Sequence, residues 1–92
     1  MEEKRICAVI SGRVQGVAFR ANCRHQALAR GVRGWVRNRG DGAVEALFEG
    51  PVDQVDAMLR WCHHGPPAAE VTEVAVTEAP PGPPLRAFNI RY

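Results

Sequence analysis

Residues 6–31 read ICAVISGRVQGVAFRANCRHQALARG, and this stretch decides the first half of the fold. It opens with the apolar run Ile6 to Ile10, which predicts a central strand covered on both faces. A loop with two glycines follows, and from Phe19 onward the apolar residues recur at helical spacing. Gly31 is placed to end that helix, because glycine adopts the left-handed backbone of a helix C-terminus at little cost. The stretch therefore predicts a strand, a glycine-containing loop and a helix.

The following segment predicts a β-hairpin. Two strands are expected at residues 32–38 and 43–49, on either side of Arg39-Gly40-Asp41-Gly42. An Asp-Gly pair between two such runs favours a tight turn, because glycine supplies the positive φ that the turn requires. Apolar and mostly polar positions alternate in the second strand, so one of its faces is expected to be dry and the other mostly wet.

The second half of the chain predicts another helix and two more strands. Pro51 stands at the expected first position of the helix, where its missing N–H costs nothing. An apolar stripe at helical spacing runs through residues 52–62. Strands are expected at residues 73–77 and 88–92, where apolar and other residues alternate, with a proline-rich loop at residues 79–84 between them.

The predicted order of elements is βαββαβ followed by a short terminal strand. That order is typical of a ferredoxin-like sandwich, an α+β fold in which two helices pack on one face of an antiparallel sheet. The length of 92 residues fits one domain, and no repeat, low-complexity tract or linker indicates a second unit. We therefore expect a single domain over residues 1–92.

Composition and charge argue against several classes of protein. The 46% of hydrophobic and 24% of charged residues are ordinary for a soluble globular protein. A net charge of +2 is too small to indicate a nucleic-acid partner. No apolar run approaches the roughly 20 residues of a membrane span, and the charged N-terminus does not resemble a signal peptide.

The cysteines indicate the compartment in which the protein works. The three of them are odd in number, far apart and without a CxxC pair, which argues against a disulfide framework and for a reducing compartment. We therefore expect a cytoplasmic protein in which Cys7, Cys23 and Cys62 are buried as small hydrophobic residues. A monomer is expected because the sequence has no long exposed apolar stripe.

The loop between the first strand and the first helix carries the chemistry that the sequence suggests. Residues 12–20 contain two glycines and lead into the N-terminus of the helix. Such a turn can aim successive backbone N–H groups into one concavity, and the helix dipole adds positive potential there. Arg20 stands in the expected first turn, so its guanidinium can hold two oxygens of the same anion. The pattern predicts a phosphate site, although it is not a Walker A loop because GxxxxGK[ST] is absent.

Two long blocks of the sequence resemble the signature blocks of the acylphosphatase family. They are Gly12-Arg13-Val14-Gln15-Gly16-Val17-x-Phe19-Arg20 and Gly34-Trp35-Val36-Arg37-Asn38-x-x-Asp41-Gly42-x-Val44-Glu45. Shorter matches follow at Glu49-Gly50, Trp61-Cys62, Gly65-Pro66 and Phe88-x-Ile90-x-Tyr92. The resemblance covers nearly the whole chain, and the order and spacing of the two long blocks make it highly specific.

The resemblance implies a site and a reaction. In the family the backbone amides of a loop bind the phosphate, and the corresponding residues here are Gln15, Gly16, Val17, Ala18, Phe19 and Arg20. Arg20 would also hold the phosphoryl oxygens, and Asn38 would position the attacking water. The implied enzyme hydrolyses the carboxyl–phosphate bond of a small acyl phosphate to carboxylate and inorganic phosphate, with no metal, no cofactor and no phosphoenzyme. Ala18 and Cys23 depart from residues common in the family, and a modest effect on the rigidity of the loop is expected.

Two other functions are compatible with the same fold. One is a catalytically silent phosphate- or nucleic-acid-binding module, since a ferredoxin-like sheet can present aromatic side chains to single-stranded RNA. Against this function, the chain lacks the aromatic-rich strand motif that such binding uses. The other is an accessory domain, because acylphosphatase-like domains also occur inside larger maturation proteins; a chain that ends at its last strand favours a standalone enzyme. Acetyl phosphate, carbamoyl phosphate and 1,3-bisphosphoglycerate all stay open as substrates, because no run of residues defines an acyl pocket.

Overall fold

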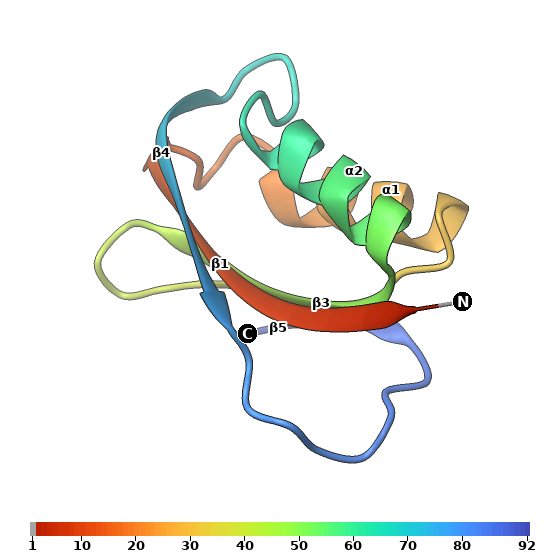
Figure 1. The fold of residues 1–92 in the computed structure, drawn as a ribbon. Helices are drawn as coiled ribbons and strands as arrows, with labels where there is room; N and C mark the ends of the chain where they lie inside the picture. Colours follow the sequence, from red (N-terminus) through yellow and green to blue (C-terminus); the bar gives the residue numbers. More distant parts are fainter. Residues whose placement is uncertain (1) are drawn as a thin grey trace.

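In the computed structural model, which describes residues 2–92, two helices pack against one face of a sheet (Figure 1). The strands are β1 (Glu3–Arg13), β2 (Arg33–Asn38), β3 (Val44–Pro51), β4 (Glu70–Glu78) and β5 (Phe88–Arg91). The helices are α1 (Phe19–Ala29) and α2 (Val52–Cys62). The order βαββαβ with a terminal strand is confirmed, and so is the ferredoxin-like α+β class. Among residues 2–92, no helix is long and apolar enough to cross a lipid bilayer.

The strands lie side by side in the order β4-β1-β3-β2-β5. The strands of the predicted sandwich are antiparallel to their neighbours, because β1 pairs with both β3 and β4, and β2 pairs with β3. β5 pairs in parallel with the other side of β2, so the complete sheet is mixed. This last pairing places the C-terminal end of β5 beside the C-terminal end of β2.

The expectation for the first strand is wrong in part. β1 extends beyond the apolar run at both ends, and its side chains alternate between two faces. Ile6, Ala8 and Ile10 are buried, whereas Cys7 and Val9 are only half-buried. Both helices cover the same face of the sheet, so the opposite face has no helix over it (Figure 1). An unbroken apolar run does not distinguish such a one-sided strand from one covered on both faces.

The core lies between the two helices and the sheet. From the helices it receives Phe19, Cys23, Ala27, Val55, Met58 and Cys62. From the sheet, Phe48 of β3 and Phe88 of β5 stack with their ring centroids 6.0 Å apart, although β2 lies between their strands. Both phenylalanines are paired in register with Gly34 of β2, which has no side chain to separate the rings. This glycine therefore lets the core continue across β2.

Replacing Gly34 with alanine is expected to destabilise the protein by about 3 kcal/mol or more. A Cβ at this position would lie 1.8 Å from the carbonyl oxygen of Leu47, and the φ of +143° is a backbone that residues with side chains rarely adopt. The midpoint of urea unfolding measures the loss. Gly40→Ala is the matched control, because a Cβ there meets nothing within 4 Å. Equal midpoints for the two variants would contradict this explanation of Gly34.

Glu49 of β3 is a buried carboxylate that organises the face of the sheet without helices. It accepts hydrogen bonds from Arg5 Nε at 2.7 Å and from the backbone N–H of Leu85 at 2.8 Å. Arg5 also donates to three carbonyl oxygens of the proline-rich loop, which passes below the sheet in Figure 1. Burial acts to raise the pKa of Glu49, but these hydrogen bonds and the charges of Arg5 and Arg33 outweigh it, so the pKa lies below its ordinary value.

The Glu49 interactions are expected to contribute stability that depends on pH. Because the pKa is lower in the folded protein, the contribution is fully present above the ordinary glutamate pKa of about 4.3 and is lost as the pH is lowered through the folded-state value. Glu49→Gln should therefore lower the free energy of unfolding by about 2 kcal/mol at neutral pH and by much less at about pH 3. Urea unfolding at both pH values measures the two differences, and a difference independent of pH would count against this role.

Candidate active site

One pocket of about 190 Å³ is lined by most of the residues that the sequence predicts for the site. Its lining consists of Val14, Gly16, Ala18, Phe19, Arg20, Ala21, Asn38, Ile90 and Tyr92. They come from the loop before α1, the first turn of α1, the end of β2 and the C-terminal residues at and after β5. Of the expected site residues, only Gln15 and Val17 are outside this lining.

The entry loop, residues 14–18, turns twice through left-handed backbone before α1 begins. Gly16 has a φ of +74° and Ala18 a φ of +64°. Left-handed residues alternating with ordinary ones turn successive N–H groups toward one side, which forms an anion-binding concavity. Glycine adopts this backbone freely, whereas Ala18 does so at a cost of about 1 kcal/mol. Among residues 2–92, Ala18 is the only non-glycine residue with positive φ, so the strain lies at the pocket.

The N-terminus of α1 presents unpaired N–H groups to the same pocket. Ala18 is the N-cap residue and supplies no side-chain hydrogen bond, and among the described residues of the first turn none is acidic. The first N–H groups of a helix have no partner within the helix, and its dipole makes this end positive. An anion is therefore the group that this helix end is suited to bind.

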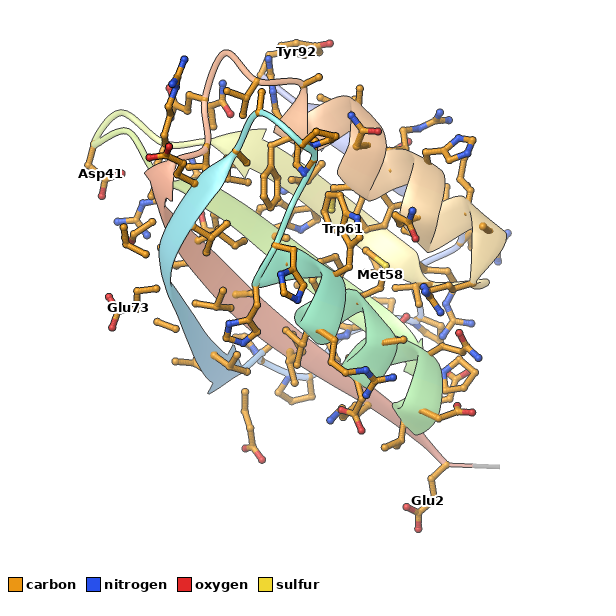
Figure 2. The ribbon with its side chains drawn as sticks, turned by 90° about the horizontal axis from the view of Figure 1, so that it is seen from above. Glu2, Asp41, Met58, Trp61, Glu73 and Tyr92 are labelled. Atoms are coloured by element: carbon orange, nitrogen blue, oxygen red, sulfur yellow. The ribbon has the colours of Figure 1, made fainter. Side chains whose placement is uncertain are left out.

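Arg20 places a positive charge beside these N–H groups. Its guanidinium lies over the ring of Tyr92, 5.0 Å from the ring centroid, and Figure 2 shows Tyr92 at the end of the molecule where α1 begins. The ion pairs among residues 2–92 involve other basic residues and not Arg20. The charge of Arg20 is therefore not neutralised by a carboxylate and can hold the oxygens of a bound anion.

Asn38 lines the pocket from the end of β2. Side chains alternate along a strand, so Asn38 lies on the same face as the buried residues Gly34 and Val36, which is the face that the helices cover. It is half-buried, and its carboxamide offers both a hydrogen-bond donor and an acceptor to a molecule in the pocket. The structure thus places a neutral polar group in the same pocket as the helix N-terminus.

The side chain of Phe19 packs against the C-terminal end of α2. Its ring is buried and lies 5.1 Å from the ring of Trp61, which Figure 2 shows directed from α2 toward α1. Gly65 also packs against this ring, since a Cβ at Gly65 would lie 2.8 Å from Phe19 Cε2. The residue that begins α1 is therefore fixed by packing, which keeps the orientation of the first helical turn.

Cys23, one turn after Arg20, is a packing residue. Its side chain is fully buried. Burial, and then the neighbouring thiol of Cys62, raise the pKa of Cys23 well above its ordinary value, so the reactive thiolate is disfavoured. The expected burial is confirmed for Cys23 and Cys62, whereas Cys7 is only half-buried.

The contribution of β5 to the pocket does not follow from the sequence. Ile90 and Tyr92 line it because β5 pairs with β2 in parallel, with Ile90 opposite Val36. The alternating pattern Phe88-x-Ile90-x-Tyr92 predicts a strand with one face toward the core, but it does not tell beside which strand that face will lie. Only the pairing of β5 with β2 brings this face to Asn38.

Known proteins of one family resemble this chain in both sequence and fold. The family model for acylphosphatase matches residues 6–90. An acylphosphatase of Rubrobacter xylanophilus is 51% identical over 90 residues, which cover 98% of this chain and 82% of the relative. One of Haloarcula marismortui is 48% identical over 93 residues, with complete coverage of both chains. The crystal structure of an acylphosphatase from Bacillus subtilis superposes with a TM-score of 0.92 at 36% identity and covers 99% of this chain and 100% of its own. The chain belongs to the acylphosphatase family.

Proposed function

We propose that the chain hydrolyses the carboxyl–phosphate bond of small acyl phosphates to a carboxylate and inorganic phosphate by direct attack of water at phosphorus. One observation carries the proposal: the uncapped N-terminus of α1, the guanidinium of Arg20 and the carboxamide of Asn38 belong to a single pocket. The first two are suited to the phosphoryl oxygens, and the third is suited to a neutral water molecule.

The chemistry of an acyl phosphate matches what these groups supply. Its leaving group is a carboxylate, which departs without a strong general acid. Phosphoryl transfer then depends mainly on holding the reactants in line and on stabilising charge on the phosphoryl oxygens. In our proposal the N–H groups of the entry loop and Arg20 stabilise that charge, and Asn38 holds the water by a hydrogen bond.

The proposed step needs no group other than these and the substrate. The water oxygen forms a bond to phosphorus while the bond from phosphorus to the acyl oxygen breaks, and the electron pair leaves with the carboxylate. The proton of the water passes to an oxygen of the phosphate itself. Because Arg20 and the helix N-terminus provide the positive charge, we propose a reaction without a metal, a cofactor or a phosphoenzyme.

The setting of the enzyme is part of the proposal. We propose a cytoplasmic monomer that does not bind nucleic acid, supported by the modest net charge of +2 and by the three cysteines, which are unpaired in residues 2–92. The acyl group is not specified further, since in our proposal the polar groups Arg20 and Asn38 serve the phosphate and the attacking water.

Isotope labelling tests both the reaction and its route. Hydrolysis of benzoyl phosphate in water enriched in oxygen-18 is expected to place the label in inorganic phosphate and none in benzoate. Added methanol should not yield methyl phosphate, because no phosphoenzyme is available to transfer its group. Label in benzoate would show attack at the carbonyl carbon, and formation of methyl phosphate would point to a phosphorylated intermediate; either result would contradict the proposed route.

A further inference from the structure

The side chain of Gln15 joins the entry loop to the β2–β3 hairpin. Its Nε2 donates to the carbonyl oxygen of Arg39 at 2.8 Å and to that of Ala43 at 3.0 Å. Both partners can only accept, so both N–H groups of the carboxamide are used and its orientation is determined. The side chain is half-buried and lies outside the lining of the pocket.

The two carbonyl groups that Gln15 contacts also close the hairpin turn. The N–H of Arg39 donates to the carbonyl oxygen of Ala43 at 2.8 Å, and the N–H of Gly42 donates to that of Arg39 at 3.3 Å. Asn38, the last residue of β2, precedes Arg39 in the chain. A contact from the entry loop to these two carbonyl groups therefore connects that loop to the backbone that carries Asn38.

Strand pairing does not set the separation between the entry loop and Asn38 directly. The entry loop follows β1, Asn38 ends β2, and among residues 2–92 the strand β3 lies between those two strands in the sheet. Gln15 spans this distance, because Ala43 stands immediately before β3 and Arg39 immediately after β2. Its carboxamide thus connects the entry loop directly to the hairpin backbone next to Asn38.

We propose that Gln15 is a positioning residue that sets the separation between the phosphate bound at the entry loop and the water held by Asn38. This inference rests on the proposed function. An error of about 1 Å in such a separation can reduce the rate of reaction about 100-fold. Arg20 and the first turn of α1 are held by the helix and by the packing of Phe19 on Trp61, so loss of the carboxamide is expected to affect kcat more than phosphate affinity.

The test compares Gln15→Met, which keeps the length of the side chain and removes both donors, with the wild-type chain. We expect kcat for benzoyl phosphate to be reduced by about 10- to 100-fold, and the inhibition constant of inorganic phosphate to change by less than about threefold. In the Asn38→Ala background the same substitution should cause no further loss, because the group that Gln15 positions is already absent. Gln15→Asn, too short to reach both carbonyls, is a second variant with the same expected losses.

Asp41→Ala is the matched control within the same hairpin. Asp41 accepts a hydrogen bond from the N–H of Ala43 at 3.1 Å, so its removal loosens the turn without breaking the connection to the entry loop. Its kcat should stay within about threefold of the wild type.

An inactive wild-type chain would refute the proposed function itself. With an active wild type, the role of Gln15 is overturned by an unchanged kcat in both Gln15 variants, by an equal loss in phosphate affinity, or by fully additive losses with Asn38→Ala.

Discussion

Replacing Asn38 with alanine is expected to lower kcat by about 100-fold or more and to leave the affinity for inorganic phosphate within about threefold of the wild type. Asn38 lines the pocket from β2, whereas the positive charge of the site comes from α1 and Arg20. Removing the carboxamide therefore takes away the proposed partner of the attacking water and leaves the groups that we propose bind phosphate. Steady-state hydrolysis of benzoyl phosphate gives kcat, and competitive inhibition by phosphate gives the affinity.

Asn89→Ala is the control for this prediction. Asn89 lies on the neighbouring strand β5 opposite Trp35, so it is on the face of the sheet away from the pocket, and it is exposed. The substitution removes the same carboxamide and should leave kcat unchanged. If folded Asn38→Ala protein kept its full kcat, Asn38 would have no part in the mechanism.

Arg20→Gln is expected to weaken phosphate binding about 100-fold, because the two charge-assisted hydrogen bonds that we propose between Arg20 and the phosphate are lost together. The value of kcat/KM should decrease by about 1,000-fold, since the same charge is needed more strongly in the transition state than in the bound substrate. This pattern differs from that of Asn38→Ala, in which kcat changes and phosphate affinity does not. Isothermal titration with inorganic phosphate and initial rates with benzoyl phosphate measure the two effects.

The control for Arg20 is Arg24→Gln, one turn later on the same helix. Arg24 Nε donates to the carbonyl oxygen of Phe88 at 3.1 Å, and the residue does not line the pocket. It carries the same charge on the same helix, so a general effect of net charge would appear in both variants. Equal phosphate affinity in wild-type and Arg20→Gln protein would contradict the assignment of Arg20 to the phosphate.

Most of the fold could be predicted because local signals agree with the tertiary structure. Gly31 has a φ of +68°, and Val32 N–H donates to the carbonyl oxygen of Ala27 at 2.9 Å, which is the helix ending that a glycine at this position predicts. The Asp-Gly pair in the hairpin behaves in the same way, since Gly42 has positive φ and Asp41 accepts from Ala43 N–H. At both Gly31 and Gly42 the backbone has a positive φ, which favours glycine.

What could not be predicted depends on which elements meet in space. The apolar run of β1 gives no sign that its second face lacks a helix, and the pattern of β5 gives no sign of the parallel pairing with β2. The motif that contains Gln15 indicates a backbone contact with phosphate, whereas its side chain bonds to Arg39 and Ala43, far along the chain. Contacts of this kind follow from topology, and a single sequence carries no local signal for them.

Hydrolysis of benzoyl phosphate by the purified chain in excess EDTA tests the proposed reaction most directly. We predict turnover that EDTA does not reduce, because Arg20 and the N-terminus of α1 supply the positive charge. The absence of turnover by a folded wild-type chain, or turnover that EDTA abolishes and added metal restores, would contradict a metal-free acylphosphatase that works through this pocket.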